Sequence, residues 1–256
     1  MLLAIILTAN STTEKTFSSI YHKWYNEYRK ELFNTIQYTD VTNIKIVGSI
    51  PKVPSLFVKD IIKKMNQKCS KLPQSFKNNT ANKLYYFRAV QYWFKVLDRE
   101  PVFEEDGVHK VTGEMKPLYF DSIKERNAVI SILSSNVFFL NYIIWSSCQV
   151  VNSRDFDISV DIKGMESQLL DKLSAYGVKL QEDYQAHSHI IKRNYSKKGR
   201  NFTMEKQHFF IKFSKPIIDE IDKVLAKHYG FTEEELDFII NYDIKYRMGD
   251  ELSTEE

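Results

Sequence analysis

The chain has 256 residues, a net charge of +3 and a pI of about 8.6. Hydrophobic residues make up 43% and charged residues 27%, which is the usage of a globular protein, and the small net charge identifies no class of binding partner by itself. This length predicts one large or two modest domains. Cys69 and Cys148 match neither zinc spacing nor a disulfide framework, so we expect free thiols in a reducing cytoplasm.

The first 50 residues predict a short β-rich unit. Residues 1–7 are apolar, lack the basic leader of a signal peptide and are too short to span a bilayer, so we expect a buried strand and no membrane association. Residues 21–33 carry aromatic and apolar side chains at helical spacing, and residues 41–50 alternate like an extended segment. Pro51 and Pro54 then indicate a boundary. A chain that starts in a core strand suggests a fragment, or a protein that completes a partner's sheet.

The next segment predicts a mixed domain. Residues 56–65 have the pattern of an amphipathic helix, and residues 84–97, rich in aromatic and β-branched side chains, predict two strands with a tight connection. Residues 103–115 contain two glycines and fit a hairpin or a long loop, and residues 116–120 fit a further strand.

Two consecutive helices are predicted after these strands. Ser122 and Glu125 have the spacing of a capping box, and the helix that begins there continues to about residue 134. Residues 137–145 are almost wholly apolar and predict a buried helix that leads into a polar turn. Residues 153–162 then alternate as a half-buried strand does.

From residue 164 onward the sequence predicts a helical C-terminal region with a basic connector inside it. A helix over residues 165–175 precedes the connector, and a second runs from Pro216 to Gly230. A third begins at the capping box of Thr232 and Glu235 and continues to about Tyr246. We therefore expect an α+β fold with three parts, at residues 1–50, 51–163 and 164–256.

The basic connector, residues 188–215, is the clearest electrostatic feature. It holds eight basic residues against Glu205 alone, a local charge of +7 that leaves −4 for the rest of the chain. Tyr195 and Phe202 lie between the cations, and Gly199 allows close approach of the backbone, a mixture that suits contact with DNA phosphates. The alternative is a solvated loop beside an acidic neighbour. The candidate phosphate-binding residues are Lys192, Arg193, Lys197, Lys198 and Arg200.

Two smaller sets of residues are candidates for contact with bases. Arg88, Tyr92 and Lys95 belong to the predicted strand pair, where cations and aromatic rings could read base edges. Asn152 and Arg154 belong to the polar turn and could pair with adenine and guanine. The alternatives are that the aromatic residues of the strands are core, and that the residues of the turn are capping and turn residues, with Arg154 and Asp155 as a local ion pair.

The sequence contains little that predicts catalysis. It has no Gly-rich phosphate loop, no HExxH and no motif for a serine or cysteine nucleophile. His187, His189 and His208 lack cysteine or carboxylate partners at ligand spacing, so we expect no metal site. Glu114 and Lys116 weakly resemble the Glu-x-Lys motif of metal-dependent nucleases, which makes a nuclease an alternative function. Acidic residues at the tip of a hairpin are common, however, and give the same pattern without catalysis.

The C-terminal residues 214–249, which begin Ser-Lys-Pro-Ile-Ile-Asp-Glu-Ile and end Asn-Tyr-Asp-Ile-Lys-Tyr-Arg-Met-Gly, resemble the closing segment of large adenine-specific DNA methyltransferases. These are enzymes of type II and IIG restriction-modification and related phage-defence systems. Residues 85–95, 130–139 and 152–155 resemble, in that order, pieces of the family's target-recognition domain. Residues 2–33 resemble the last strands of its catalytic domain, so the resemblance implies a prokaryotic, cytoplasmic protein that recognises DNA.

The chain departs from this family in the parts that carry the chemistry. It has no Asn-Pro-Pro-Tyr or Asp-Pro-Pro-Tyr motif and no S-adenosylmethionine loop, and its six prolines include no adjacent pair. The resemblance therefore implies a sequence-specific subunit for double-stranded DNA that has no autonomous activity and binds no cofactor itself.

A catalytic methyltransferase chain or domain would supply S-adenosylmethionine and the active site, and we expect it to dock on the first strand of this chain. A different class of function is a regulatory subunit of a defence complex that contacts proteins and not DNA.

Overall fold

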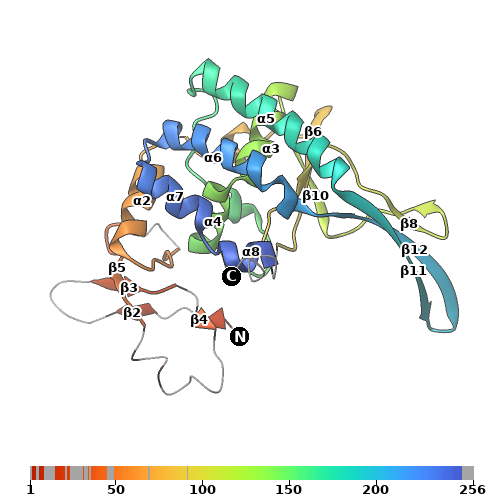
Figure 1. Cartoon of the computed structure of the whole chain (residues 1–256), viewed down its shortest axis with the longest axis horizontal. Helices are drawn as coiled ribbons and strands as arrows, with labels where there is room; N and C mark the ends of the chain where they lie inside the picture. The colour runs from red at the N-terminus through yellow and green to blue at the C-terminus, as the bar shows by residue number, and fades with distance from the viewer. Residues whose placement is uncertain are drawn as a thin grey trace.

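Helices and antiparallel strands combine in an α+β fold (Figure 1). A computed structural model describes residues 2–3, 6–8, 15–20, 22–23, 31, 34, 36–44, 49–68, 70–90 and 92–249. The α-helices of this part are α2 (Leu56–Asn66), α3 (Ile123–Ser134), α4 (Asn136–Trp145), α5 (Ser167–Ala186), α6 (Lys215–Tyr229), α7 (Glu233–Asn241) and α8 (Ile244–Met248). Three short 3-10 helices are η1 (Leu72–Ser75), η2 (Ser153–Phe156) and η3 (Ile211–Ser214).

The strands of the described part form small antiparallel sheets. Near the N-terminus β1 (Leu2–Leu3) pairs with β4 (His22–Lys23), and β3 (Thr16–Ser18) lies between β2 (Ile6–Thr8) and β5 (Thr39–Asp40). The central sheet has the order β10 (Met115–Phe120), β6 (Asn82–Phe87), β7 (Val96–Leu97). The last sheet has the order β11 (Ser188–Lys197), β12 (Arg200–Phe209), β8 (Phe103–Glu105), β9 (Val108–His109).

The centre of the hydrophobic core is formed by α3 and α4, and residues 127–142 are buried without exception. The Ser135 hydroxyl accepts a hydrogen bond from the Phe138 N–H at 3.0 Å and so begins α4 directly after α3. Phe94 packs against Phe138 with ring centroids 4.8 Å apart. One cluster of buried side chains contains members from residues 41–239, so the parts predicted at 51–163 and 164–256 share a core, and their division by function stays a prediction.

Helix α5 packs against α3 at a glycine. A Cβ atom on Gly177 would lie 2.1 Å from the backbone oxygen of Asn127, closer than any real contact. Nearby, the Ser131 hydroxyl of α3 donates a hydrogen bond to the Leu173 carbonyl of α5 at 2.6 Å. The two helices therefore approach to a distance that a side chain at residue 177 would prevent.

A buried polar network joins α4, α6 and α8. The Asp222 carboxylate accepts hydrogen bonds from the Val137 N–H at 3.1 Å and from the Asn136 amide at 2.5 Å. Arg247 donates to the Asn136 side-chain oxygen, and its guanidinium lies 4.0 Å from the centroid of the Trp93 ring. Burial raises the pKa of Asp222 to about 7 and lowers the pKa of Arg247 to about 10.

Most of the predicted helices are confirmed with small differences at their ends, but the helix predicted over residues 165–175 is α5, which continues to Ala186. Ser122 caps α3, and α6 ends at Gly230, whose φ is +71°. Thr232 and Glu235 form the predicted capping box of α7. That helix ends at Asn241 instead of continuing to about residue 246, and α8 forms a separate turn after it.

The predicted strand at residues 153–162 is wrong. η2 occupies its start, and the rest is irregular apart from one bridge between Ser159 and Lys71. All four alternating apolar residues are nevertheless buried: Phe156, Ile158, Val160 and Ile162. The pattern correctly indicates burial, but within the described part of the chain the segment pairs with no strand beyond that single bridge.

The N-terminal predictions are confirmed only in places. β1 and β2 lie within the apolar start, although β2 extends to Thr8. In the segment predicted as a helix over residues 21–33, His22–Lys23 is a short strand, and most of the other residues lie outside the described part. Residues 42–44 form a turn, and residues 45–48 lie outside the described part. That this unit is the end of a catalytic domain stays a prediction.

No single helix among the described residues is long and apolar enough to cross a membrane. Helices α3 and α4 have that length and composition only together, as a pair bent by 64°.

Candidate nucleic-acid interface

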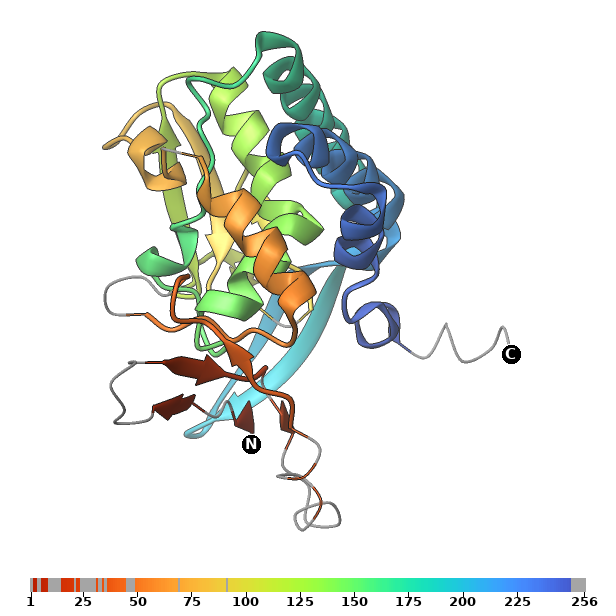
Figure 2. The same ribbon diagram turned by 90° about the vertical axis from the view of Figure 1, so that its left-hand side faces the viewer.

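Most of the basic connector is a long two-stranded hairpin. The prediction of a helical C-terminal region with a connector inside it is therefore wrong for these residues. Strands β11 and β12 have 10 residues each and pair in register from Ser188 and Phe209 to Lys197 and Arg200. Lys198 and Gly199 form the turn with φ angles of +52° and +78°, the geometry that matches the twist of a tight hairpin. Each strand is roughly 33 Å long at about 3.3 Å per residue. The hairpin extends away from the helices (Figures 1 and 2).

Because side chains alternate along a strand and paired residues share a face, the register sorts the hairpin into two unlike faces. We call one of them the basic-aromatic face. Its residues are His189, Ile191, Arg193, Tyr195 and Lys197 of β11 with Arg200, Phe202, Met204, Lys206 and His208 of β12. The opposite face is polar, and on it the Lys192 ammonium pairs with the Glu205 carboxylate at 2.7 Å. Of the predicted phosphate-binding residues, Lys192 is therefore separated from the others.

The basic-aromatic face combines a stacked pair of rings with cations. The Tyr195 and Phe202 rings stack across the hairpin with centroids 5.6 Å apart. The Arg200 guanidinium pairs with Glu105 at 2.9 Å and with Asp106 at 3.1 Å, both from the neighbouring β8 and β9 hairpin.

Arg193, Lys197 and Lys198 differ from Arg200 because they have no ion-pair partner within the described part of the chain. All three side chains are exposed. They are the cations of the hairpin that are best able to bind an external anion.

The base of the hairpin is anchored to the central sheet through Lys95. Its ammonium lies 3.8 Å from the centroid of the Phe87 ring in β6 and 5.7 Å from that of Phe209 in β12. Burial lowers the pKa of Lys95 to about 8. Within the base of the hairpin itself, the Gln207 amide of β12 donates a hydrogen bond to the Ser188 hydroxyl of β11 at 2.9 Å. Lys95 thus has a packing role at the base, and its contact with DNA stays a prediction.

Arg88 and Tyr92 lie in the connection between β6 and β7 and not on the hairpin. The Arg88 N–H donates to the Glu114 carbonyl at 2.8 Å, and the Arg88 carbonyl accepts from the Val151 N–H at 2.8 Å. Tyr92 is 42% exposed, and its carbonyl accepts from the Arg247 guanidinium at 3.1 Å. The structure separates these two residues from the hairpin cations, and their contact with bases also stays a prediction.

The polar turn is a capped 3-10 helix. The Asn152 N–H donates to the Asp155 carboxylate at 2.7 Å, and the Asn152 amide donates to the Val150 carbonyl at 3.2 Å. The alternative that Asn152 and Asp155 are capping residues is therefore confirmed. Arg154 is exposed and lines a polar pocket together with Trp145.

That pocket also contains Asn141, a residue that the sequence pattern assigns to the core. Asn141 and Trp145 are four residues apart on α4 and so share one face of the helix. The Asn141 amide within the apolar run of α4 and the candidate Arg154 are signals of this site in the sequence. The other walls come from segments distant in sequence, which no local pattern brings together.

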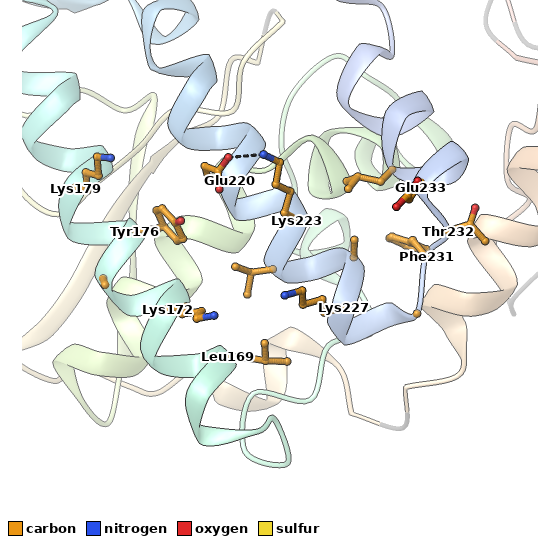
Figure 3. Close-up of a pocket in the computed structure, with 15 residues that line it drawn as sticks. Leu169, Lys172, Tyr176, Lys179, Glu220, Lys223, Lys227, Phe231, Thr232 and Glu233 are labelled. Atoms are coloured by element: carbon orange, nitrogen blue, oxygen red, sulfur yellow. Dashed lines mark hydrogen bonds and ion pairs between the residues drawn. The ribbon is translucent and has the colours of Figure 1, made fainter.

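A second cavity is an open groove of about 750 Å³ between α5, α6 and α7 (Figure 3). Its apolar lining includes Leu169, Tyr176 and Phe231. Glu220 in the same groove pairs with Lys223 at 2.5 Å. The lysines that line it are Lys172, Lys179, Lys223 and Lys227.

The residues considered for metal chemistry are dispersed. His189 and His208 are paired across the hairpin, whereas the His187 ring lies 3.2 Å from the Asp183 carboxylate in α5. Glu114 is exposed in the loop before β10. Among the described residues, no group of three or more histidine, cysteine, aspartate or glutamate side chains could hold a metal ion.

Comparison with known proteins gives no match: no family model, curated protein or solved structure is similar to this chain.

Proposed function

We propose that this chain binds double-stranded DNA through the β11 and β12 hairpin. The observation that carries the proposal is the basic-aromatic face, which places cations and stacked rings together on a ribbon that projects from the body. A two-stranded β-ribbon has the width to enter the major groove of B-DNA. Cations along such a ribbon bind the phosphates that border the groove.

The ion pairs of the hairpin distinguish the candidate residues that are free to bind phosphate from those that are not. Arg193, Lys197 and Lys198 bind phosphates in this proposal, because no carboxylate of the described part neutralises them. Arg200 and Lys192 contribute less, since each already pairs with a carboxylate. The stacked rings of Tyr195 and Phe202 provide apolar contact with the bases, including the methyl group of thymine.

The resemblance of residues 214–249, which contain α6, α7 and α8, supports a more specific role. We propose that DNA binding serves target recognition for an adenine-specific methyltransferase of a prokaryotic restriction-modification or phage-defence system. In this role a separate catalytic chain binds S-adenosylmethionine and accepts the flipped adenine. Co-expression with a chain that carries those motifs should yield a complex with site-specific adenine methylation.

The test of DNA binding is a titration of duplex DNA at several salt concentrations. We expect the triple variant Arg193→Ala, Lys197→Ala, Lys198→Ala to bind all sequences more weakly, and its slope of log affinity against log salt to fall by about 2 to 3, since each phosphate contact contributes about 0.9.

The matched control for this test is Lys172→Ala, Lys179→Ala, Lys227→Ala, which removes three exposed lysines of the groove between α5, α6 and α7. It carries the same change in net charge and should keep the wild-type slope. Equal slopes for the wild type and the hairpin variant would contradict the proposal.

The groove between α5, α6 and α7 favours a second candidate, a regulatory subunit that binds protein. Its apolar lining and its lysines suit an acidic amphipathic helix (Figure 3). The same titration separates the two functions. Negligible, salt-independent DNA binding, both alone and with a catalytic partner, supports protein binding at the groove.

A further inference from the structure

A polar pocket of about 420 Å³ opens beside the C-terminal half of α4. Asn141 and Trp145 form its α4 wall, and Arg154 and Asp155 of η2 form another. Lys71, next to η1, contributes a further wall. This volume lies in the range of sites for small organic ligands.

The Asn141 side chain is the most informative group in this pocket. It is 7% exposed, and its amide has no hydrogen-bond partner among the described residues. An amide of a mostly buried residue that bonds to no protein atom is satisfied by water or by a ligand that reaches it from the pocket. Because Asn141 lines the pocket and an amide carries both a donor and an acceptor, a ligand there can pair with this side chain.

Trp145 and the charged residues restrict the chemistry of that ligand. The half-buried indole of Trp145 offers a flat surface for an aromatic ring. The Asp155 carboxylate uses one oxygen to cap η2, which leaves the other for a donor in the pocket. Lys71 already pairs with the Asp157 carboxylate of the same pocket at 4.0 Å, so the exposed Arg154 is the cation that can bind an anion there.

We propose that this pocket binds an unpaired nucleobase that carries an exocyclic amine. The ring lies against Trp145, the base edge bonds to Asn141 and Asp155, and the adjoining phosphate is bound by Arg154. Asparagine pairs with adenine through one donor and one acceptor, and a carboxylate accepts from an exocyclic amine. The source is either a free nucleotide or a base unpaired from a DNA strand, and only the second source rests on the proposed DNA binding.

The first experiment uses free nucleotides and the full chain. Calorimetric titration with 2′-deoxyadenosine 5′-monophosphate should show saturable binding, and thymidine 5′-monophosphate, which lacks the amine, should bind more weakly. Asn141→Leu, a change to a side chain of similar size, should reduce affinity for the adenine nucleotide about tenfold through loss of its hydrogen bonds. Its melting temperature, measured in parallel, should not fall, because the Asn141 amide forms no hydrogen bond within the described part of the chain.

Two further variants locate the ligand. Asn241→Leu is the matched control, since the exposed Asn241 amide bonds to the Asp237 carbonyl within its own helix, and it should leave affinity unchanged. Arg154→Ala should weaken binding of the monophosphate more than that of deoxyadenosine. An equal loss for both would overturn the placement of the phosphate.

The second experiment distinguishes the sources with a duplex that contains one unpaired adenine and a fully paired duplex. If the base comes from DNA, the wild type prefers the first duplex and Asn141→Leu loses that preference. Saturable binding of the free monophosphate without such a preference supports a free nucleotide. Unchanged affinities of Asn141→Leu for every probe, or no saturable binding of any probe, overturn the proposal.

These outcomes do not depend on the hairpin. The triple variant Arg193→Ala, Lys197→Ala, Lys198→Ala should bind the free monophosphate as the wild type does, whatever it does to duplex binding.

Discussion

The hairpin and the helical core are stabilised in opposite ways. Residues 127–142 of the core are all buried, whereas no residue of β11 or β12 is buried. The order of the hairpin comes from backbone pairing and from cross-strand pairs such as Tyr195 with Phe202. Substitutions in the core should therefore change stability, and substitutions on the exposed face of the hairpin should change binding with little effect on stability.

The largest effect on stability is expected at the buried network of the core. Asp222→Ala removes the acceptor of the Val137 N–H and the Asn136 amide. Leaving these two donors unpaired should lower the free energy of unfolding by about 2 to 4 kcal/mol. Urea denaturation followed by circular dichroism measures the change.

Asp219→Ala is the matched control for this variant. It removes a neighbouring, partly exposed carboxylate that pairs with Lys215 at 2.6 Å and accepts only a longer hydrogen bond, 3.3 Å, from the Asn136 amide. Its cost should be below about 1 kcal/mol. Equal losses for the two variants would contradict a special role for the network.

The close approach of α3 and α5 should give the next largest effect. In Gly177→Ala the new methyl group meets the Asn127 carbonyl, so the helices must separate, at a cost of about 1 to 3 kcal/mol. Gly113→Ala, where nothing lies within 4 Å of the new Cβ, should change stability by less than about 0.5 kcal/mol. Urea denaturation of both variants tests this, and an unaffected Gly177→Ala would show that the helices can shift freely.

The pH dependence of stability should also originate in the core. Burial raises the pKa of Asp222 from 3.8 to about 7, so between these values the folded chain binds more protons than the unfolded chain. The contribution of this group to stability is then largest below pH 4 and is lost as pH rises toward 7. Asp222→Asn cannot ionise and should flatten the unfolding free energy over this range. An unchanged pH profile in that variant would assign the dependence to other groups.

The same comparison explains what could be predicted from sequence. Helices of the core carry strong local signals: an apolar run for α4, and capping residues at Ser122, Thr232 and Gly230. The hairpin buries neither face and so lacks the apolar alternation by which strands are predicted. The only local sign of a hairpin is the Lys198-Gly199 turn between two segments of similar length. A basic surface loop could contain the same two residues, so this sign does not distinguish a hairpin from a loop.

The hairpin site could be predicted better than the pocket, because the hairpin belongs to one segment of the sequence and the pocket does not. The charge of the hairpin is a property of one segment, so Arg193, Lys197 and Lys198 could be proposed before their register was known. The pocket of Asn141 and Trp145 depends on how η2 and the region around Lys71 pack beside α4. That packing is set by contacts between distant segments, and no local pattern contains it.

The smallest effect on stability is expected from the hairpin variant that should have the largest effect on DNA binding. In Arg193→Ala, Lys197→Ala, Lys198→Ala, the three side chains are exposed and without ion-pair partners in the described part of the chain, so their removal breaks no native interaction with a carboxylate there. The free energy of unfolding should stay within about 0.5 kcal/mol of the wild type. A loss above about 1 kcal/mol in urea denaturation would mean that these residues support the fold, and weaker DNA binding by the variant would then no longer identify a binding surface.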